Sequence, residues 1–143
     1  APLSPDIAPP PVAGSSAEQA DYERALGILR EGRYPEAADA FNRLLASYPG
    51  GDYADNATYW LGETYYVTRE FDRALSTFST LVTNFPQSSK VPDARLKIGY
   101  IHYEKSNWKL ARQELSTVVS TYPGTTAARL ANDRLQRMST EGR

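Results

Sequence analysis

The chain has 143 residues, of which 41% are hydrophobic and 23% charged, so it can form one globular domain with some chain to spare. It contains no cysteine, and its single histidine, His102, supplies too few ligands for a structural zinc site. The net charge of −1 does not favour a general nucleic-acid surface, and no apolar run could cross a bilayer. We therefore expect no cofactor, no metal, no nucleic-acid partner and no membrane insertion.

The N-terminal segment is rich in proline. Residues 1–16 hold five of the ten prolines, including the run from Pro9 to Pro11, which favours an extended backbone without a packing face. We expect a disordered linker here. Because the chain starts with Ala1 and shows no signal-peptide pattern, we interpret it as a processed protein or a fragment whose preceding part is missing.

The rest of the chain repeats every 37 residues. Each unit ends in an aromatic residue followed by proline, at Tyr48-Pro49, Phe85-Pro86 and Tyr122-Pro123. Up to and including the aromatic residue of each pair, apolar residues recur at offsets of 0, 3, 4, 7, 10, 11 and 14, with Arg112 as the one exception, and these offsets form one face of a four-turn helix. These helices start at Tyr34, Phe71 and Trp108.

A second, proline-free helix is expected before each of these, over residues 20–31, 56–68 and 93–105. Gly62 and Gly99 lie one period apart in these first helices, and we expect each to let the paired helix approach closely. The candidate helix caps, also 37 residues apart, are Asp52, Ser89 and Thr126.

The spacing predicts an all-α chain of three helix-turn-helix units. We place them at about 18–51, 55–88 and 92–125 within a domain spanning 17–139, followed by a capping helix at 126–138. In that last helix Leu130, Leu135 and Met138 are expected to cover the stack. Arg134 and Arg137 are expected to face water or, alternatively, to close the basic end of the groove. Residues 140–143 are expected to be a disordered tail.

The units resemble the tetratricopeptide repeat (TPR) family, an α-solenoid, whose pattern is W-x2-L-G-x2-Y…A-x3-F…P. The second unit matches best, while the third has His102 in the tyrosine place. The matching residues of the second unit are Leu61, Gly62, Tyr65, Ala74, Phe78 and Pro86.

Three further stretches are similar to the periplasmic YbgF (CpoB) family of the bacterial Tol-Pal system. They are Tyr59-Trp60-Leu61-Gly62, the run from Phe85 to Ser89, and the run from Pro92 to Gly99. The resemblance implies a periplasmic protein that trimerises through an N-terminal coiled coil missing here, so that this fragment alone is monomeric. It also implies docking of TolA and, through a bifunctional penicillin-binding protein, coordination of outer-membrane constriction with peptidoglycan synthesis at cell division.

A stripe on the first helices is the candidate partner-binding groove. In tetratricopeptide arrays the first helices line a concave face, and residues at offsets 0, 4 and 7 share one side of each helix. Tyrosine suits such a surface because it offers contact area and a polar tip with few rotors. The stripe consists of Tyr22, Leu26, Tyr59, Glu63, Tyr66, Leu96, Tyr100 and Tyr103.

The expected function is a non-enzymatic protein-interaction scaffold. With Glu63 and Glu104 nearby, the groove would suit a partner with apolar and basic or amide side chains, such as an Ala/Lys-rich helix. Two other functions remain open, a subunit of an outer-membrane protein assembly complex and a self-associating structural module. An enzyme built on His102 is disfavoured because no nucleophile elbow, phosphate loop or metalloprotease motif is present.

Charge is also unevenly distributed along the chain. Residues 1–92 carry 7 basic and 12 acidic side chains, a net charge of −5, and residues 93–143 carry 9 and 5, a net charge of +4. Either these are solvated helix faces, or the gradient orients a partner.

Overall fold

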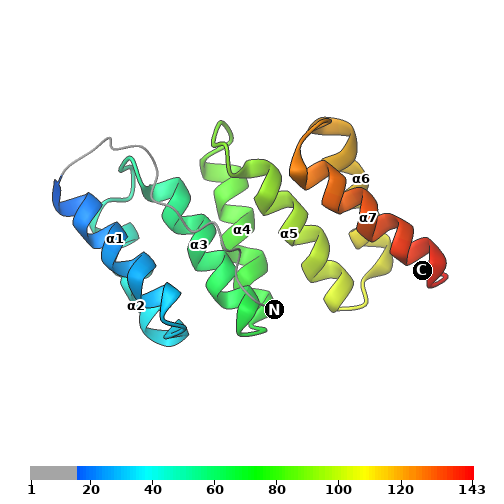
Figure 1. Cartoon of the computed structure of the whole chain (residues 1–143). Coiled ribbons are helices and arrows are strands. Elements are labelled where there is room, and N and C mark those ends of the chain that lie inside the picture. The colour runs from blue at the N-terminus through cyan, green and yellow to red at the C-terminus, as the bar shows by residue number, and fades with distance from the viewer. Residues whose placement is uncertain (1–15) are drawn as a thin grey trace. The chain divides into compact units, whose positions relative to one another are not determined.

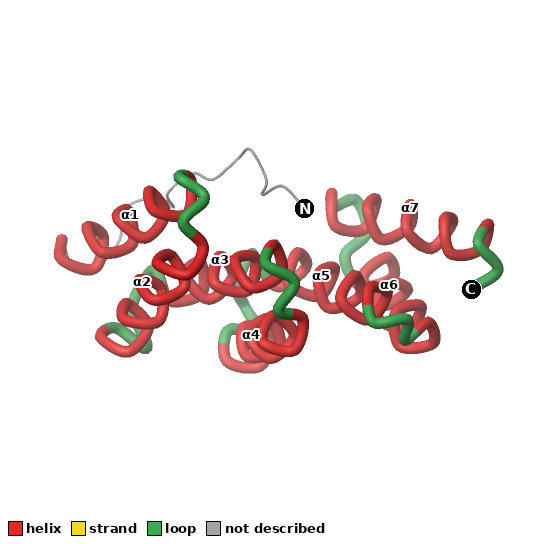
Figure 2. Tube along the Cα trace, turned by 90° about the horizontal axis from the view of Figure 1, so that it is seen from below, coloured by secondary structure: helices red, strands yellow, loops and turns green. Residues whose placement is uncertain are grey.

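The computed structural model describes residues 16–143 and forms helices joined by short loops there (Figure 1). Within that range it contains no strand (Figure 2), so the predicted all-α class is confirmed. The proline-rich segment expected to be a linker lies outside the described residues, except that Ser16 already belongs to the first helix. The helices are α1 (Ser16–Arg30), α2 (Tyr34–Ser47), α3 (Ala54–Val67), α4 (Phe71–Asn84), α5 (Val91–Glu104), α6 (Trp108–Thr121) and α7 (Thr126–Thr140).

The helices divide into two compact units, residues 1–77 and 78–143, with the division inside α4. In the first unit α2 packs against both α1 and α3. In the second unit α6 packs against α5 and α7, and α7 also contacts α5 (Figure 1). Each second helix begins and ends 37 residues after the previous one, as the spacing predicted.

The predicted apolar face of the second helices forms the core of each unit. In α2 the side chains of Phe41 and Leu44 are at most 1% exposed, and in α6 Leu115 and Val118 are fully buried. Burying a side chain of this size contributes about 1.5–3 kcal/mol, so this face is the main stabilising surface of each hairpin.

The turn inside each helical hairpin depends on one residue in the left-handed region of backbone space. Gly32, Arg69 and Ser106 have φ values of 76°, 62° and 60° and stand 37 residues apart. At each turn the next residue donates its N–H to a carbonyl five positions earlier, as Asn107 does to His102 at 2.8 Å. These bonds satisfy carbonyls that the end of the first helix would leave unpaired.

The predicted close approach at Gly99 is confirmed. A Cβ atom added there would lie 2.6 Å from Leu115 Cδ2 and 2.8 Å from its Cγ, well inside van der Waals contact. Because Leu115 is fully buried, it has little room to move. Glycine at this position therefore lets α5 lie directly against α6.

The predicted helix caps are wrong. The cap positions are Tyr53, Lys90 and Thr125, one residue away from those expected, and of these only Thr125 caps its helix with its own side chain, accepting from Ala128 N–H at 3.1 Å. The loop after each aromatic-proline pair contains an additional turn, so the helix begins one residue earlier or later than the polar residue indicates.

At the start of α3, the carboxylate of a residue in α1 acts as the helix cap. Glu18, only 3% exposed, accepts a hydrogen bond from Tyr53 N–H at 3.0 Å. One period later Ser88 accepts from Lys90 N–H at 3.1 Å, with its own hydroxyl. In the first unit the position equivalent to Ser88 is occupied by Gly51. A Cβ atom added to Gly51 would lie 2.0 Å from Glu18 Oε2. The carboxylate thus fills the space that a side chain at position 51 would need.

The C-terminal helix is longer than expected. α7 continues to Thr140, and Arg143 N–H donates to the Met138 carbonyl at 2.8 Å. The expectation of a disordered tail at 140–143 is therefore wrong. Met138 is fully buried and Leu130 and Leu135 pack at the edge of the core, as predicted for a capping helix.

We expect Gly99→Ala to destabilise the protein although alanine is the better helix former. The added methyl must displace Leu115, which costs about 1–3 kcal/mol and exceeds the roughly 1 kcal/mol gained in helix propensity. Gly27→Ala in α1 is the matched control, because nothing lies within 4 Å of its Cβ position, and it should stabilise by up to about 1 kcal/mol. Urea unfolding measures both, and a stable Gly99→Ala variant would contradict the close approach.

Glu18 and Gly51 should behave as a coupled pair. Glu18→Ala leaves the Tyr53 N–H without its acceptor, at a cost of about 1–3 kcal/mol, and Gly51→Ser alone should also destabilise because it meets the carboxylate. In the double variant the introduced hydroxyl can accept from Tyr53 as Ser88 does from Lys90, so the two losses should not add. A double-mutant cycle in urea measures the coupling, with Gly50→Ala, which has open space around it, as control.

Candidate partner-binding site

The first-unit part of the predicted stripe is buried in the core. Tyr22 and Leu26 on α1 are fully buried, so their assignment to an exposed groove is wrong. The ring of Tyr22 lies 4.9 Å from that of Tyr53 and 6.5 Å from that of Phe41, which cover it from the α2–α3 side. Burial raises the pKa of Tyr22 above its ordinary value, as expected for a phenol removed from water.

The α3 residues of the stripe are also largely covered. Tyr59, Glu63 and Tyr66 are 8%, 3% and 9% exposed, and ten of the fourteen residues of α3 are buried. The ring of Tyr66 stands edge-on to that of Phe71 at 5.7 Å. The hydrophobic pattern could not show this, because it identifies one buried face per helix whereas α3 is enclosed on most of its sides.

In the second unit one stripe residue remains half-exposed. Leu96 and Tyr103 on α5 are buried at 3% and 8% exposure, whereas Tyr100 keeps part of its surface in solvent. Partial burial raises the pKa of Tyr100, so its hydroxyl stays protonated at neutral pH. Tyr100 is therefore the residue of the predicted set that is best placed to touch a partner.

Side chains from α7 surround Tyr100 and Tyr103. The guanidinium carbon of Arg134 lies 4.1 Å from the ring centre of Tyr100 and 4.7 Å from that of Tyr103, both within the range of cation–π contacts. Arg137 lies 5.7 Å from the Tyr103 ring. Arg134 is only partly exposed, so the expectation that it faces water is met in part, since α7 packs on α5 as well as on α6.

The last turn of α7 is joined to α5 by a hydrogen bond. Tyr103 donates its hydroxyl proton to Glu141 Oε1 at 2.6 Å, and Arg137 Nε lies 3.4 Å from Glu141 Oε2. The hydrogen bond from Tyr103, followed by the bond and charge of Arg137, lowers the pKa of Glu141 below its ordinary value. The sequence does not predict this contact, because the polar residues after Met138 carry no apolar pattern that would extend the helix.

His102 lies on α5 and is partly buried. Burial lowers the pKa of His102, and its Nδ1 atom is buried with no hydrogen-bond partner among the described residues. The carboxylate of Glu114, whose charge acts on His102, is paired with Arg95 at 3.1 Å between α5 and α6. Over residues 16–143 no group of three or more His, Cys, Asp or Glu side chains is placed to hold a metal ion.

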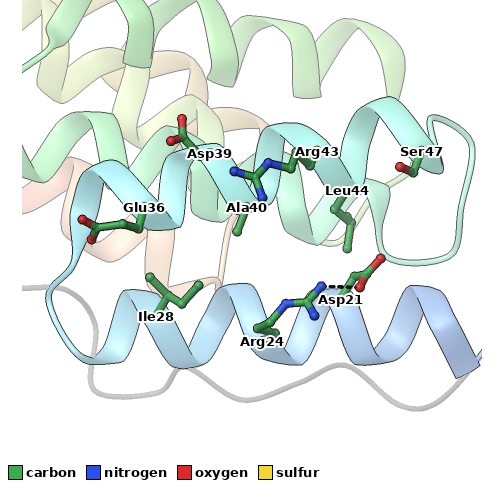
Figure 3. A pocket seen from close by; sticks show the side chains of 9 residues that line it. All are labelled: Asp21, Arg24, Ile28, Glu36, Asp39, Ala40, Arg43, Leu44 and Ser47. Atoms are coloured by element: carbon green, nitrogen blue, oxygen red, sulfur yellow. Dashed lines mark hydrogen bonds and ion pairs between the residues drawn. The ribbon is translucent and has the colours of Figure 1, made fainter.

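A gap of about 570 Å³ that the sequence does not predict lies between α1 and α2. Figure 3 shows the side chains that line it. Side chains of mixed charge line it, with the ion pair of Arg24 and Asp21 along one wall (Figure 3). Its remaining lining is Ile28, Glu36, Asp39, Ala40, Arg43, Leu44 and Ser47. With acids and bases of similar number, the gap has no clear ligand preference.

The helical hairpins at a fixed period define a helical-repeat protein, and comparison with known families identifies which one. The tetratricopeptide repeat family matches residues 13–52, 22–89 and 59–126, most of the chain, and the chain belongs to this family. Its repeats serve as protein-interaction scaffolds. Among residues 16–143, none of the helices is both long and apolar enough to cross a bilayer.

Two curated relatives are similar over a short stretch. Both are the "Cell division coordinator CpoB" of Pseudomonas putida, each 41% identical over 46 residues, which is 32% of this chain. The matched stretch spans only 17% of the length of those relatives.

Solved structures share the fold at low sequence identity. The type III secretion translocator chaperone SycD of Yersinia enterocolitica has a TM-score of 0.76 at 15% identity, covering 92% of this chain and 89% of that chain. SycD in complex with a peptide of the translocator YopD scores 0.72 at 16%, covering 87% and 90%. The first TPR of Spaghetti (RPAP3) bound to an HSP90 peptide scores 0.72 at 17%, covering 92% and 98%.

The contact between Tyr103 and Glu141 predicts a pH response at the end of α7. Because the pKa of Glu141 is lower in the folded protein than in the unfolded chain, its stabilising effect is present above the unfolded pKa and is lost as the pH falls through the folded one. Tyr103→Phe should return the Glu141 pKa toward its ordinary value. Carboxyl NMR titration measures this pKa, and an unchanged value in Tyr103→Phe would show that the hydrogen bond does not form in solution.

Proposed function

We propose that this chain is the interaction domain of a periplasmic, non-enzymatic scaffold that docks a TolA-like protein and coordinates outer-membrane constriction with peptidoglycan synthesis in cell division. The observation that carries this proposal is the 41% identity over 46 residues to the cell division coordinator CpoB. The long 37-residue period of the helices is consistent with it. In the complete protein, an N-terminal coiled coil would make the scaffold trimeric, and a bifunctional penicillin-binding protein would be a further partner.

The proposed contact surface centres on Tyr100 of α5. Of the eight residues in the predicted stripe, Tyr100 alone is partly exposed rather than buried, while Leu96 and Tyr103 support it from the core. A phenol ring with a protonated hydroxyl offers both apolar area and a hydrogen bond to a partner helix.

Peptide ligands of the structural neighbours support a segment, rather than a whole domain, as the bound element. SycD was solved with a peptide of YopD and the Spaghetti domain with a peptide of HSP90. By this argument the ligand here is one helix or extended strand of the partner. An alanine-rich helix with charged side chains, as expected for the TolA stalk, offers both apolar and polar groups to the partly exposed ring of Tyr100.

Calorimetric titration of the chain with the purified periplasmic stalk of TolA tests the proposal. We expect saturable 1:1 binding that Tyr100→Ala weakens by about tenfold, because a central aromatic contact commonly contributes 1–2 kcal/mol or more. Leu110→Ala is the matched control, since this large side chain is 48% exposed on α6, away from the α5 stripe, and its loss should leave binding unchanged.

Absence of binding at low and at physiological salt would contradict docking of TolA and favour a role in outer-membrane protein assembly. Equal losses in Tyr100→Ala and Leu110→Ala would keep the partner but move the site. Circular dichroism of both variants shows whether the helices remain intact, which the partial exposure of Tyr100 predicts.

A further inference from the structure

Arg134 is held in a fixed position by two aromatic rings. It lies on α7, and its guanidinium carbon is 4.1 Å from the ring centre of Tyr100 and 4.7 Å from that of Tyr103. A guanidinium packed on an aromatic ring keeps its N–H groups at the edge of the plane, where they can still donate. Because the two rings restrict its motion, Arg134 would lose little conformational freedom on binding an acceptor.

The nearby carboxylates are engaged elsewhere. Glu141 accepts from Tyr103 at 2.6 Å and lies 3.4 Å from Arg137, and Asp133 lies 3.9 Å from Arg129. Among the residues that the structure describes, no carboxylate lies within ion-pair distance of Arg134. A half-buried guanidinium without an internal acid is a charge that an external carboxylate can satisfy.

The surroundings of Arg134 favour an anionic group. Lys97 Nζ lies 5.8 Å from the centre of the Tyr100 ring, on the same aromatic side chain. Residues 78–143 carry 10 basic and 5 acidic side chains, a net charge of +5, whereas residues 16–77 carry 6 and 11, a net charge of −5. The second unit therefore attracts acidic groups and the first unit does not.

We infer that Arg134 is a binding residue for an acidic side chain, Glu or Asp, on a helical segment of the partner protein. The acid would pair with the edge of the guanidinium, and an apolar side chain one turn away on the same helix would pack on Tyr100. This inference rests on the proposed docking at Tyr100 and adds the chemistry of the partner. It corrects, for the second unit, the expectation of basic or amide groups on the partner.

A helical segment is chosen over a free C-terminal carboxylate for a physical reason. A chain terminus offers two carboxylates close together when its last residue is acidic, and a site for it needs several donors side by side. Here Arg134 stands between Tyr100 and Tyr103, which are donors of one hydroxyl each, and the hydroxyl of Tyr103 is already bonded to Glu141. One side-chain carboxylate matches this single guanidinium better.

The test uses three fluorescent alanine-rich helical peptides of about 20 residues that differ at one central position, Glu, Gln or Lys. Fluorescence anisotropy with the unaltered chain should show the Glu peptide binding about tenfold more tightly than the Gln peptide, and the Lys peptide most weakly. Because this comparison changes only the peptide, it does not depend on the folding of any variant. Equal binding of the three peptides, or absence of binding by all of them, would overturn the inference.

Protein variants then locate the site. Arg134→Gln should reduce binding of the Glu peptide to the level of the Gln peptide, and Arg134→Lys should recover only part, since it keeps the charge but not the fork. Arg112→Gln, which removes an exposed arginine from α6, is the charge-matched control and should cost little. Full binding by Arg134→Gln would assign the acid to another cation and overturn the inference.

The same variants with the TolA stalk separate this inference from the proposed function. If the stalk binds and Arg134→Gln has no effect, the acidic contact is wrong while the docking stands. If the stalk does not bind but the Glu peptide does so through Arg134, the site is supported and a partner other than TolA is required. A terminal carboxylate as ligand would appear as a peptide with a free C-terminal Glu binding more tightly than the internal Glu.

Discussion

Close packing of a first helix on its second helix is the constraint on which the rest of the structure depends. In the second unit it is seen where α5 lies against α6, with no room for a methyl group between Gly99 and Leu115. The turn before α6 must then reverse the chain within three residues, and Ser106 adopts φ of 60° to allow it. Serine in this conformation is strained by roughly 1 kcal/mol or more, which the burial of the α6 face offsets.

The same constraint explains why the helix ends carry so much of the specificity. The loop between one hairpin and the next leaves backbone N–H groups at the start of the following helix, and a nearby oxygen must accept from them. Ser88 and Thr125 supply their own hydroxyls, while Glu18 reaches Tyr53 from another helix. The residue that accepts a hydrogen bond from the start of a first helix thus differs from unit to unit. Where Gly51 offers no side chain, the carboxylate of Glu18 from the preceding first helix replaces the local cap.

The sequence alone predicted the periodic part of the fold. It did not predict side-chain exposure at positions where residues from other elements cover the side chain. The 37-residue spacing placed the three second helices, and the small residue at Gly99 predicted the close approach, because both depend on local geometry. The predicted exposure of Tyr22 was wrong, because the rings that cover it belong to Phe41 in α2 and Tyr53 in the loop before α3. The contact of Arg134 with the rings of Tyr100 and Tyr103 was not predicted for the same reason, although its place 37 residues after Lys97 marks α7 as a further first helix.

That equivalence also bears on how charge is used along the repeat. At one repeat position the first helices carry Trp60, Lys97 and Arg134, and in α7 the last of these packs on tyrosines of α5. An arginine at the end of the array can stack on rings and still offer hydrogen bonds, which a tryptophan inside the array cannot do to the same degree. A stacked arginine at this position therefore keeps the packing of the helix on its neighbour. It also adds a polar group in α7, the last helix among the described residues. The proposed acidic contact uses a side chain that also packs on the tyrosines of α5.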